Sequence, residues 1–228
     1  MGNKALFWDF DGTLIQPNRS SFCSLKEALL QLHYEIADEH IAAVLRSVLS
    51  WNNWEHSYED ATGDQWWDRL FDDLIPFYER NGITDYEKVN SLLKENVTSF
   101  RWYSLFEDTD RVLRYCMDKG WRNYIVSNNY PELPQAIEML GLAPYFEGYA
   151  ISSLVGYEKP HPGIFRYAME LAEHPEDAYM IGDNPVADIR GAHSAGMKTI
   201  FLHPADRNPC LNADFNCVSL TEIMSIIG

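Results

Sequence analysis

Residues 5–15, which read ALFWDFDGTLI, give the clearest indication of how this chain folds. The first half is an apolar run of strand length that only Asp9 interrupts, which predicts a buried parallel strand with a polar end. Asp9 and Asp11 then leave the core together, directly before a Gly-Thr turn. Two carboxylates this close repel each other unless one is protonated or a cation lies between them. The segment therefore predicts a site for a metal ion and a phosphate at the end of this strand.

The composition indicates a folded protein without a membrane span. Of the 228 residues, 46% are hydrophobic and 23% are charged, which is typical of a globular domain. No stretch approaches the roughly 18 consecutive apolar residues of a membrane helix, and the amino terminus lacks the pattern of a secretory signal. We therefore expect a cytoplasmic protein with no membrane partner. The four cysteines form no C-x-x-C pair, which favours reduced thiols over a disulfide.

The charge balance excludes some partners. A formal net charge of −16 argues against nucleic acid or anionic lipid as a ligand. It also opposes an anionic phosphate ester, but salt screens surface charges beyond about 8 Å. A metal ion and a lysine can therefore dominate the local potential inside a cleft.

The chain divides into a core domain and an insert. Residues 18–99 predict an all-helical cap domain between the two parts of the core, residues 1–17 and 100–228. The insert holds several tryptophans, for which core packing is favoured over a stacking surface for substrate. They are Trp51, Trp54, Trp66 and Trp67, with His56 among them. Expected helices are 24–32 with a capping box at Ser24, 38–48 capped by Asp38, one from 64 to the Asn81-Gly82 stop, and one from Asp85.

From residue 108 onward, helical and extended patterns alternate. This alternation predicts an α/β fold, a Rossmann-like doubly wound parallel sheet with right-handed crossovers. Ligands of such sheets bind beyond the carboxyl ends of the strands, and Asp9, Ser127 and Asp183 all lie at or just past such ends. The expected helices are 108–119, 134–140, 162–172 and 186–195. The expected strands are 123–127, 148–152, 178–181 and 198–202. A last helix is expected to begin at a capping box at Ser219.

Three further segments carry groups suited to phosphate chemistry. Residues 124–129, YIVSNN, end a strand with the Ser127 hydroxyl and two amides, which can hold phosphate oxygens without adding charge. Residues 156–165, GYEKPHPGIF, place Lys159 before prolines that restrict the backbone. Residues 180–188, MIGDNPVAD, end a strand with one aspartate and begin the next helix with another.

Together with DFDGTL at residues 9–14, these segments resemble, in order, the four motifs of the haloacid dehalogenase-like (HAD) hydrolase superfamily. The resemblance covers residues 5–15 and about 108–202. In kind and position, the insert looks like the helical cap of subfamily I, in the phosphoglycolate phosphatase and β-phosphoglucomutase-like branch. Ile15-Gln16-Pro17 departs from the small residue and Asp or Ser that usually follow the first motif there. The resemblance therefore names no substrate.

The resemblance implies a Mg²⁺-dependent phosphatase that hydrolyses a small phosphorylated metabolite through an aspartyl-phosphate. Asp9 is the expected nucleophile, Asp11 the general acid and base, and Lys159 a catalytic positive charge. The metal would bind an Asp9 carboxylate oxygen, the Asp11 backbone carbonyl and Asp183. The expected phosphate-binding residues are Gly12, Thr13, Ser127, Asn128 and Lys159, and Asp188 and Asn184 are expected to support the site, Asp188 by orienting Lys159 or a metal-bound water.

Other functions stay open at this point. A sugar phosphomutase would use the same four motifs, and a regulatory module would keep the pocket without turnover, although it would have no use for a general acid. Halide-removing relatives lack the second aspartate, so Asp11 argues against a dehalogenase. A phosphonate-cleaving enzyme needs a lysine of the cap, but Lys26, Lys88 and Lys94 read as solvated. A receiver domain would carry its phosphorylated aspartate on a middle strand.

Overall fold

The computed structural model describes residues 3–49, 61–204 and 208–228. These residues form two units, one within Met1–Pro17, Trp54–Thr62 and Ser104–Gly228 and the other within Asn18–Asn53 and Gly63–Tyr103. The first unit carries the sheet, and the described residues of the second are helical or lie in turns and loops.

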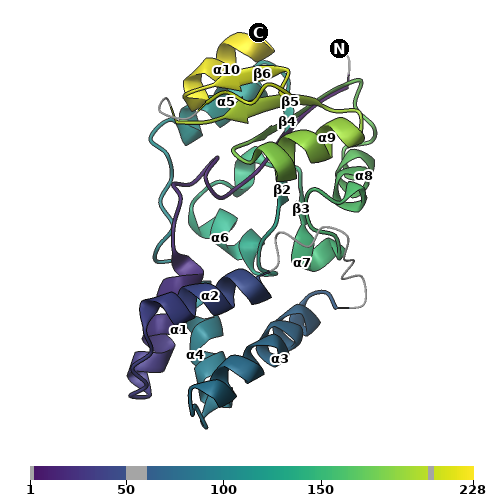
Figure 1. The fold of residues 1–228 in the computed structure, drawn as a ribbon. Helices are drawn as coiled ribbons and strands as arrows, with labels where there is room; N and C mark the ends of the chain where they lie inside the picture. Colours follow the sequence, from purple (N-terminus) through teal and green to yellow (C-terminus); the bar gives the residue numbers. More distant parts are fainter. Residues whose placement is uncertain (1–2, 50–60, 205–207) are drawn as a thin grey trace. The chain divides into compact units, whose positions relative to one another are not determined.

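A six-stranded sheet in the order β3-β2-β1-β4-β5-β6 lies at the centre of the first unit (Figure 1). Every neighbouring pair of strands is parallel. The chain adds β2 and β3 on one side of β1 and the later strands on the other, so the strand order reverses at β1. The predicted doubly wound α/β fold is confirmed. The strands are β1 (Lys4–Trp8), β2 (Arg122–Ser127), β3 (Gly148–Ile151), β4 (Asp177–Gly182), β5 (Lys198–Leu202) and β6 (Phe215–Cys217).

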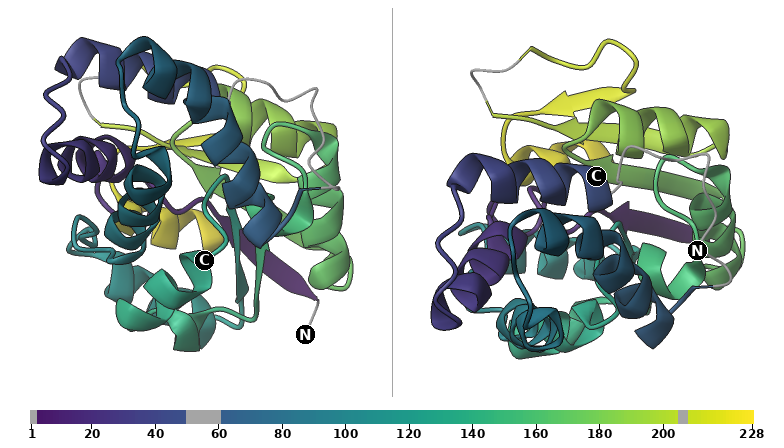
Figure 2. Two further views of the ribbon diagram at one scale, coloured as in Figure 1. Left: turned by 90° about the horizontal axis from the view of Figure 1, so that it is seen from below. Right: turned by 60° about the horizontal axis from the view of Figure 1, so that its bottom comes forward.

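Helices cover both faces of the sheet, with α5 and α10 on one side and α8 and α9 on the other (Figures 1 and 2). Ala5 and Phe7 of β1 pack in a core cluster with residues of α8 and α9, and the alternate residues Leu6 and Trp8 are equally buried. The central strand is therefore apolar on both faces, as a covered parallel strand requires. The helices are α5 (Thr109–Asp118), α6 (Leu133–Met139), α7 (Ser152–Val155), α8 (Pro162–Leu171), α9 (Gly191–Ser194) and α10 (Leu220–Ile227).

The second unit contains four described helices: α1 (Ser20–Gln31), α2 (Asp38–Val48), α3 (Asp64–Arg80) and α4 (Tyr86–Thr98). The apolar face of α3 is buried and includes Trp66 and Trp67, so these two tryptophans pack in the core. Trp51, Trp54 and His56 lie outside the described residues. The three lysines expected to be solvated form surface ion pairs, Lys26 with Asp38, Lys88 with Asp85 and Lys94 with Asp64.

Two predicted helix starts are wrong. α1 begins at Ser20, so Ser24 lies inside the helix, where it is buried, and forms no capping box. In α2, Ala37 occupies the N-cap position in an extended conformation and Asp38 is the first helical residue. There it places negative charge in the first turn, which the helix dipole favours, without capping the helix. In both cases the local pattern identified the helix but misplaced its first residue.

The carboxyl-terminal half differs from the prediction in four places. The helix expected over 186–195 is a wide π-type turn, η2 (Pro185–Arg190), followed by the short helix α9. Neither α7 nor β6 is predicted by the sequence pattern, since each is only a few residues long. Ser219 is the N-cap of α10 but makes no capping hydrogen bond, and the Glu222 carboxylate accepts from the Val218 backbone N–H at 2.9 Å instead.

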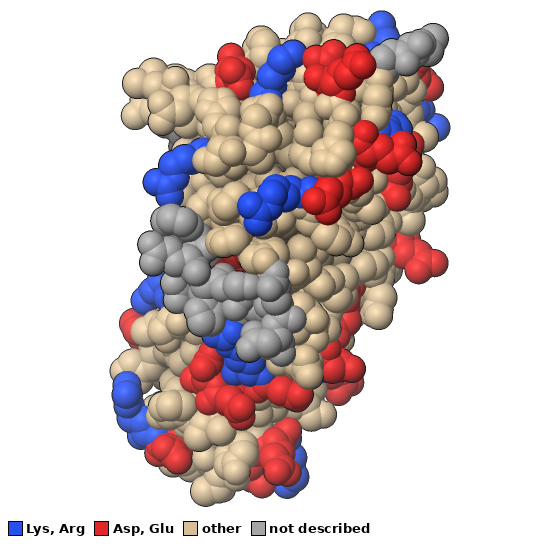
Figure 3. Space-filling model, turned by 90° about the vertical axis from the view of Figure 1, so that its right-hand side faces the viewer, with Lys and Arg blue, Asp and Glu red and all other residues tan. Residues whose placement is uncertain are grey.

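The charged side chains of the surface and the state of the cysteines can be compared with the composition. Acidic and basic side chains are interspersed on the face drawn in Figure 3. All four cysteines are free, as expected. Within the described residues, we find no helix with the length and apolar character needed to span a membrane.

Candidate active site

The first acidic residue extends β1 at the centre of the sheet. The Asp9 backbone N–H donates to the Ile181 carbonyl of β4 at 2.9 Å, which holds Asp9 beside the end of that strand. The chain then turns, with the Leu14 and Ile15 amides both bonded to the Phe10 carbonyl. This turn explains why Asp9, 7% exposed, and the half-buried Asp11 emerge at the carboxyl end of the sheet, where the strand order reverses.

Gly12 allows the turn to approach the fourth motif closely. Its φ of +81° lies in the region that favours glycine, and a Cβ at this position would lie 2.6 Å from Asp183 Oδ2. The Asp183 carboxylate therefore rests against the Gly12 backbone, directly after β4. Two segments far apart in the sequence, the first motif and the fourth, meet at this contact.

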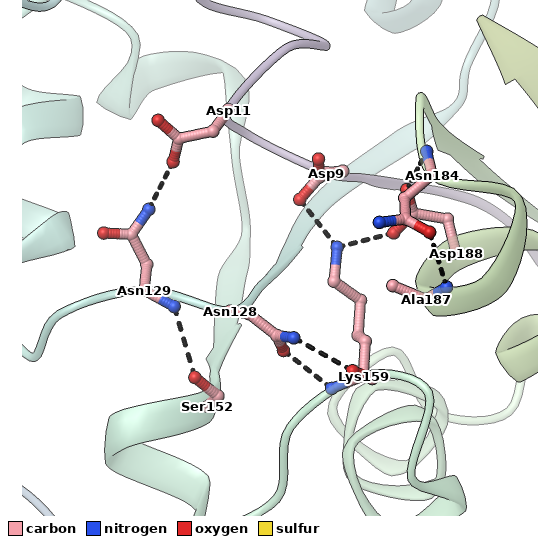
Figure 4. Close-up of polar contacts among 9 residues, drawn as sticks. All are labelled: Asp9, Asp11, Asn128, Asn129, Ser152, Lys159, Asn184, Ala187 and Asp188. Carbon is pink, nitrogen blue, oxygen red and sulfur yellow. Dashed lines mark hydrogen bonds and ion pairs between the residues drawn. The ribbon is translucent and has the colours of Figure 1, made fainter. Parts of the chain in front are cut away.

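Lys159 joins two carboxylates inside the site (Figure 4). Its Nζ lies 2.6 Å from Asp9 Oδ1 and 2.6 Å from Asp188 Oδ1. Lys159 is 2% exposed and Asp188 is fully buried. A lysine in this position needs both partners, because an unpaired buried ammonium would be strongly unfavourable.

The electrostatic environment keeps Lys159 charged. Burial alone would lower the pKa of Lys159, but the Asp188 and Asp9 carboxylates outweigh it and hold that pKa above its ordinary value. Burial also raises the pKa of Asp188, against the opposing effect of the Lys159 ammonium. One ammonium group therefore pairs with two carboxyl groups, so the cluster has more acidic than basic groups.

Asn128 holds the backbone of Lys159. Its Oδ1 accepts from the Lys159 N–H at 2.6 Å and its Nδ2 donates to the Lys159 carbonyl at 2.9 Å (Figure 4). Phosphate binding by Asn128 stays a prediction, and the structure adds that its side-chain amide bonds to the Lys159 backbone. The reason is that the loop before α8 comes back to the end of β2, which the sequence pattern does not reveal.

Asp188 and Asn184 form a support at the start of η2. Asp188 Oδ2 accepts from the Asn184 backbone N–H at 2.9 Å, and Asn184 Oδ1 accepts from the Val186 and Ala187 amides, each at 3.0 Å. A Cβ on Gly182 would lie 2.2 Å from Asp188 Oδ2, so only glycine leaves room for this carboxylate. Asp188 is thereby locked with its other oxygen toward Lys159.

Two predicted phosphate ligands carry buried hydroxyl groups. Ser127 ends β2 and is 1% exposed, and Thr13 in the first turn is fully buried. Neither Ser127 Oγ nor Thr13 Oγ1 has a hydrogen-bond partner within the described part of the chain. Buried hydroxyls are normally satisfied, so both are available to a ligand.

The sequence reasoning missed Ser152, and it considered Asn129 only as an amide that can hold phosphate, not as a partner of Asp11. Asn129 Nδ2 donates to Asp11 Oδ2 at 2.6 Å, and its backbone N–H donates to Ser152 Oγ at 3.2 Å (Figure 4). The Ser-Asn-Asn stretch contains a signal for Asn129, since both amides follow the end of a strand. Ser152 gives no such signal, because it reads as the last residue of a strand and in fact begins α7.

The acidic groups are suited to a divalent cation. Asp9, Asp183 and Asp188 each offer a carboxylate oxygen, and these oxygens lie within 4.8 Å of one another. Hard cations prefer oxygen ligands of this kind. Lys159 already engages Asp9 and Asp188, whereas Asp183 lies at the Gly12 turn. The donor set therefore fits a metal ion placed between the first and fourth motifs.

Comparisons with known proteins show which sequences and structures this chain is similar to. A family model described as haloacid dehalogenase-like hydrolase matches residues 3–196. Haloacid dehalogenase-like hydrolase domain-containing protein 3 of Xenopus laevis is 31% identical over 144 residues, which cover 61% of this chain and 58% of that protein. A phosphoserine phosphatase of Thermus thermophilus is 32% identical over 143 residues, covering 60% of this chain and 57% of that enzyme. The chain thus covers less than two thirds of these relatives.

Two further comparisons extend over most of the chain. A glyceraldehyde 3-phosphate phosphatase of Pyrococcus furiosus is 25% identical over 208 residues, covering 87% of this chain and 80% of that protein. The crystal structure of a HAD phosphatase from Thermococcus onnurineus has a TM-score of 0.67 and 21% identity, and the match covers 99% of this chain and 98% of that one. The matched family model spans all four motifs, and the chain belongs to the haloacid dehalogenase-like hydrolase family.

Proposed function

We propose that this chain is a Mg²⁺-dependent phosphatase that hydrolyses a small phosphorylated metabolite through an aspartyl-phosphate on Asp9. The observation that carries the proposal is the buried contact of Lys159 with Asp9 at the switch point of the sheet, with Asp11 two residues further on. Two relatives are named as phosphatases of phosphoserine and of glyceraldehyde 3-phosphate, which supports a small ester as substrate.

The proposed reaction has two steps. An Asp9 oxygen attacks phosphorus, the bond between phosphorus and the ester oxygen breaks, and Asp11 gives its proton to the departing oxygen. Asp11, now a carboxylate, then takes a proton from water as the water oxygen attacks phosphorus. The bond to Asp9 breaks, inorganic phosphate leaves, and both side chains return to their starting states.

The surrounding groups stabilise the phosphate. At about 4 Å and an effective dielectric constant near 20, the Lys159 ammonium contributes roughly 4 kcal/mol of gross Coulomb attraction. Ser127 and Thr13 offer hydroxyl hydrogen bonds without adding charge. Bound Mg²⁺, held by Asp9, Asp183 and the Asp11 backbone carbonyl, would supply the positive charge that allows a carboxylate and a phosphate dianion to meet.

The sequence predictions on organisation remain part of this proposal. They are a core of residues 1–17 and 100–228, a helical cap of residues 18–99, and a cytoplasmic location.

The test is a screen of nucleotide, sugar and short organic-acid phosphates, with and without magnesium, that measures release of free phosphate. We expect magnesium-dependent release from at least one small ester, and we expect Asp9→Asn to abolish it while leaving the circular dichroism spectrum unchanged. Transfer of phosphate to sugar without release would identify a phosphomutase. Release at a near wild-type rate by purified Asp9→Asn would contradict the assignment of the nucleophile.

A further inference from the structure

Asn129 connects Asp11 to the second motif. It is 4% exposed and directly follows Asn128, whose side chain holds Lys159. Its Nδ2 lies 2.6 Å from Asp11 Oδ2, although 118 residues separate the two positions in the sequence. Figure 4 shows the Asn129 side chain directed at the Asp11 carboxylate. The two residues that follow β2 thus serve different partners, one the lysine and one the second aspartate.

Three contacts fix the orientation of the Asn129 amide. Asn129 Oδ1 accepts from the Tyr130 backbone N–H at 2.9 Å, so the oxygen side of the amide is already committed. The Asn129 backbone N–H donates to Ser152 Oγ at 3.2 Å, which anchors the residue to the start of α7. A reversed amide would place its oxygen against the Asp11 carboxylate and two N–H donors against each other. The Nδ2 donor must therefore face Asp11.

We propose that Asn129 is a positioning residue that presents one chosen oxygen of Asp11 to the substrate. The inference rests on the proposed function, in which Asp11 protonates the leaving oxygen. Asp11 Oδ2 accepts a hydrogen bond from a group that can only donate, which favours a proton on Oδ1, because the carbonyl oxygen of a carboxyl group is the better acceptor. Asn129 also prevents rotation of the carboxyl group. Because a small misplacement of a reacting group can cost about 10²-fold in rate, this control affects proton transfer directly.

The proposal predicts a defect that depends on the leaving group. Protonation matters most when the departing oxygen is a poor leaving group, such as an alkoxide, and least when it is a stable phenolate. In Asn129→Ala, we expect kcat/KM for glycerol phosphate to fall by about 10-fold or more. We expect kcat/KM for p-nitrophenyl phosphate to remain within about twofold of wild type, because nitrophenolate leaves without a proton.

The measured quantity is kcat/KM. This ratio depends only on the steps up to departure of the alcohol or phenol, and not on the later hydrolysis of the aspartyl-phosphate. A series of aryl and alkyl phosphates, from p-nitrophenyl phosphate to glycerol phosphate, gives the dependence on leaving group for the wild type and each variant. Asn129→Ser serves where the alanine variant does not fold, since its hydroxyl can still accept from Tyr130 but is too short to reach Asp11. The matched control is Asn123→Ala, another buried amide of the same strand region, bonded to Trp8 and Tyr145.

The possible outcomes distinguish the positioning role of Asn129 from the proposed phosphatase function. A steeper dependence on leaving group in the Asn129 variants, with the wild-type dependence in Asn123→Ala, supports the positioning role. An equal loss on all esters, or no loss on any, in a folded Asn129 variant would overturn it while leaving the phosphatase proposal intact. Absence of phosphate release by the wild-type protein would overturn the proposed function and this inference with it.

Discussion

At the scale of single residues, the candidate site depends on which atoms can approach each other closely. Gly12 and Gly182 leave no space for a side chain, because Asp183 and Asp188 fill it. Asp11 and Lys159 are each held by an asparagine from one dipeptide. Small changes at these positions should therefore have large effects on chemistry and limited effects on the fold.

The Gly12→Ala substitution tests the close approach to Asp183. Its Cβ would lie 2.6 Å from Asp183 Oδ2, and the φ of +81° disfavours alanine. We expect kcat/KM to fall by at least about 10-fold and the magnesium concentration for half-maximal activity to rise, because the carboxylate must move. Titration of activity with magnesium measures both. Gly196→Ala is the control, since its φ is similarly positive, at +78°, but a Cβ there would meet no described atom within 4 Å. An equal effect of both substitutions would show that backbone strain alone is responsible.

The Asp11→Asn substitution tests general acid and base catalysis. An amide of the same shape cannot give or take the proton, so we expect kcat to fall by at least about 10²-fold. Steady-state kinetics on the substrate found in the screen provides the measurement. A loss of less than about 10-fold would remove Asp11 from proton transfer.

At the scale of elements, a side-chain cluster ties β5 to the segment before β6. Asp214 Oδ2 accepts from the Thr199 backbone N–H at 2.8 Å and from Thr199 Oγ1 at 2.9 Å, and it pairs with His193 Nε2 at 3.0 Å. Burial alone would raise the pKa of Asp214, but the His193 and Thr199 hydrogen bonds outweigh it and hold that pKa below the ordinary value of 3.8. The charged form of Asp214 therefore stabilises this edge of the sheet.

Asp214→Asn should destabilise the protein in a pH-dependent way. Because the folded-state pKa is lowered, the contribution is fully present above the ordinary aspartate pKa and is lost as the pH falls below it. We expect a lower Tm than wild type at pH 7 and a smaller difference near pH 3. Asp177→Asn removes an exposed ion pair between Asp177 of β4 and Lys198 of β5 and serves as the control, with little expected change. A Tm difference for Asp214→Asn that does not vary with pH would contradict the role of its charge.

The element η2 shows how a local irregularity places a functional group. The Ile189 N–H bonds to the Asn184 carbonyl five residues earlier, which widens the turn that carries Asp188. Asp188 is thereby fully buried and reaches Lys159, although Asn184, Pro185 and Val186 before it are exposed. The regular helix that the sequence predicts over 186–195 would not place Asp188 in this way. Turns of the π type often occur at functional sites.

At the scale of the whole molecule, the proposed metal site lies within one of the two units. All the acidic residues of the site belong to the unit that contains the sheet. A ligand that binds only the folded state stabilises it by about 2.7 kcal/mol at 100 times its Kd. Magnesium should therefore stabilise the sheet-containing unit.

Calorimetry with magnesium, and then with excess EDTA, tests this expectation. We expect magnesium to raise the Tm and EDTA to reverse the increase. Asp183→Asn should lack the increase, because it removes a carboxylate of the site. Sodium chloride at equal ionic strength controls for screening of the net charge of −16, which any salt provides. The same increase with sodium chloride, or in Asp183→Asn, would show that magnesium acts through screening.

Sequence patterns were enough to predict the α/β class, the parallel sheet and the positions of Asp9, Asp11, Lys159 and Asp183. They were enough because these features depend on local signals: an apolar run, a polar strand end, a Gly-Thr turn and a proline-restricted loop. Strand ends of a parallel sheet meet at one edge, so their polar residues are expected together. The chemical roles of these residues stay predictions until the proposed variants are measured.

The partner that each side chain takes became known only from the tertiary structure. Asp9 and Lys159 are 150 residues apart, and Asn129 reaches Asp11 across 118 residues. No local pattern distinguishes Asn128, which holds a backbone, from Asn129, which holds a carboxylate. The physical reason is that a short polar side chain bonds to whatever the packing of distant segments brings within about 3 Å. That packing is a property of the whole sheet and its loops, and not of the few residues that end β2.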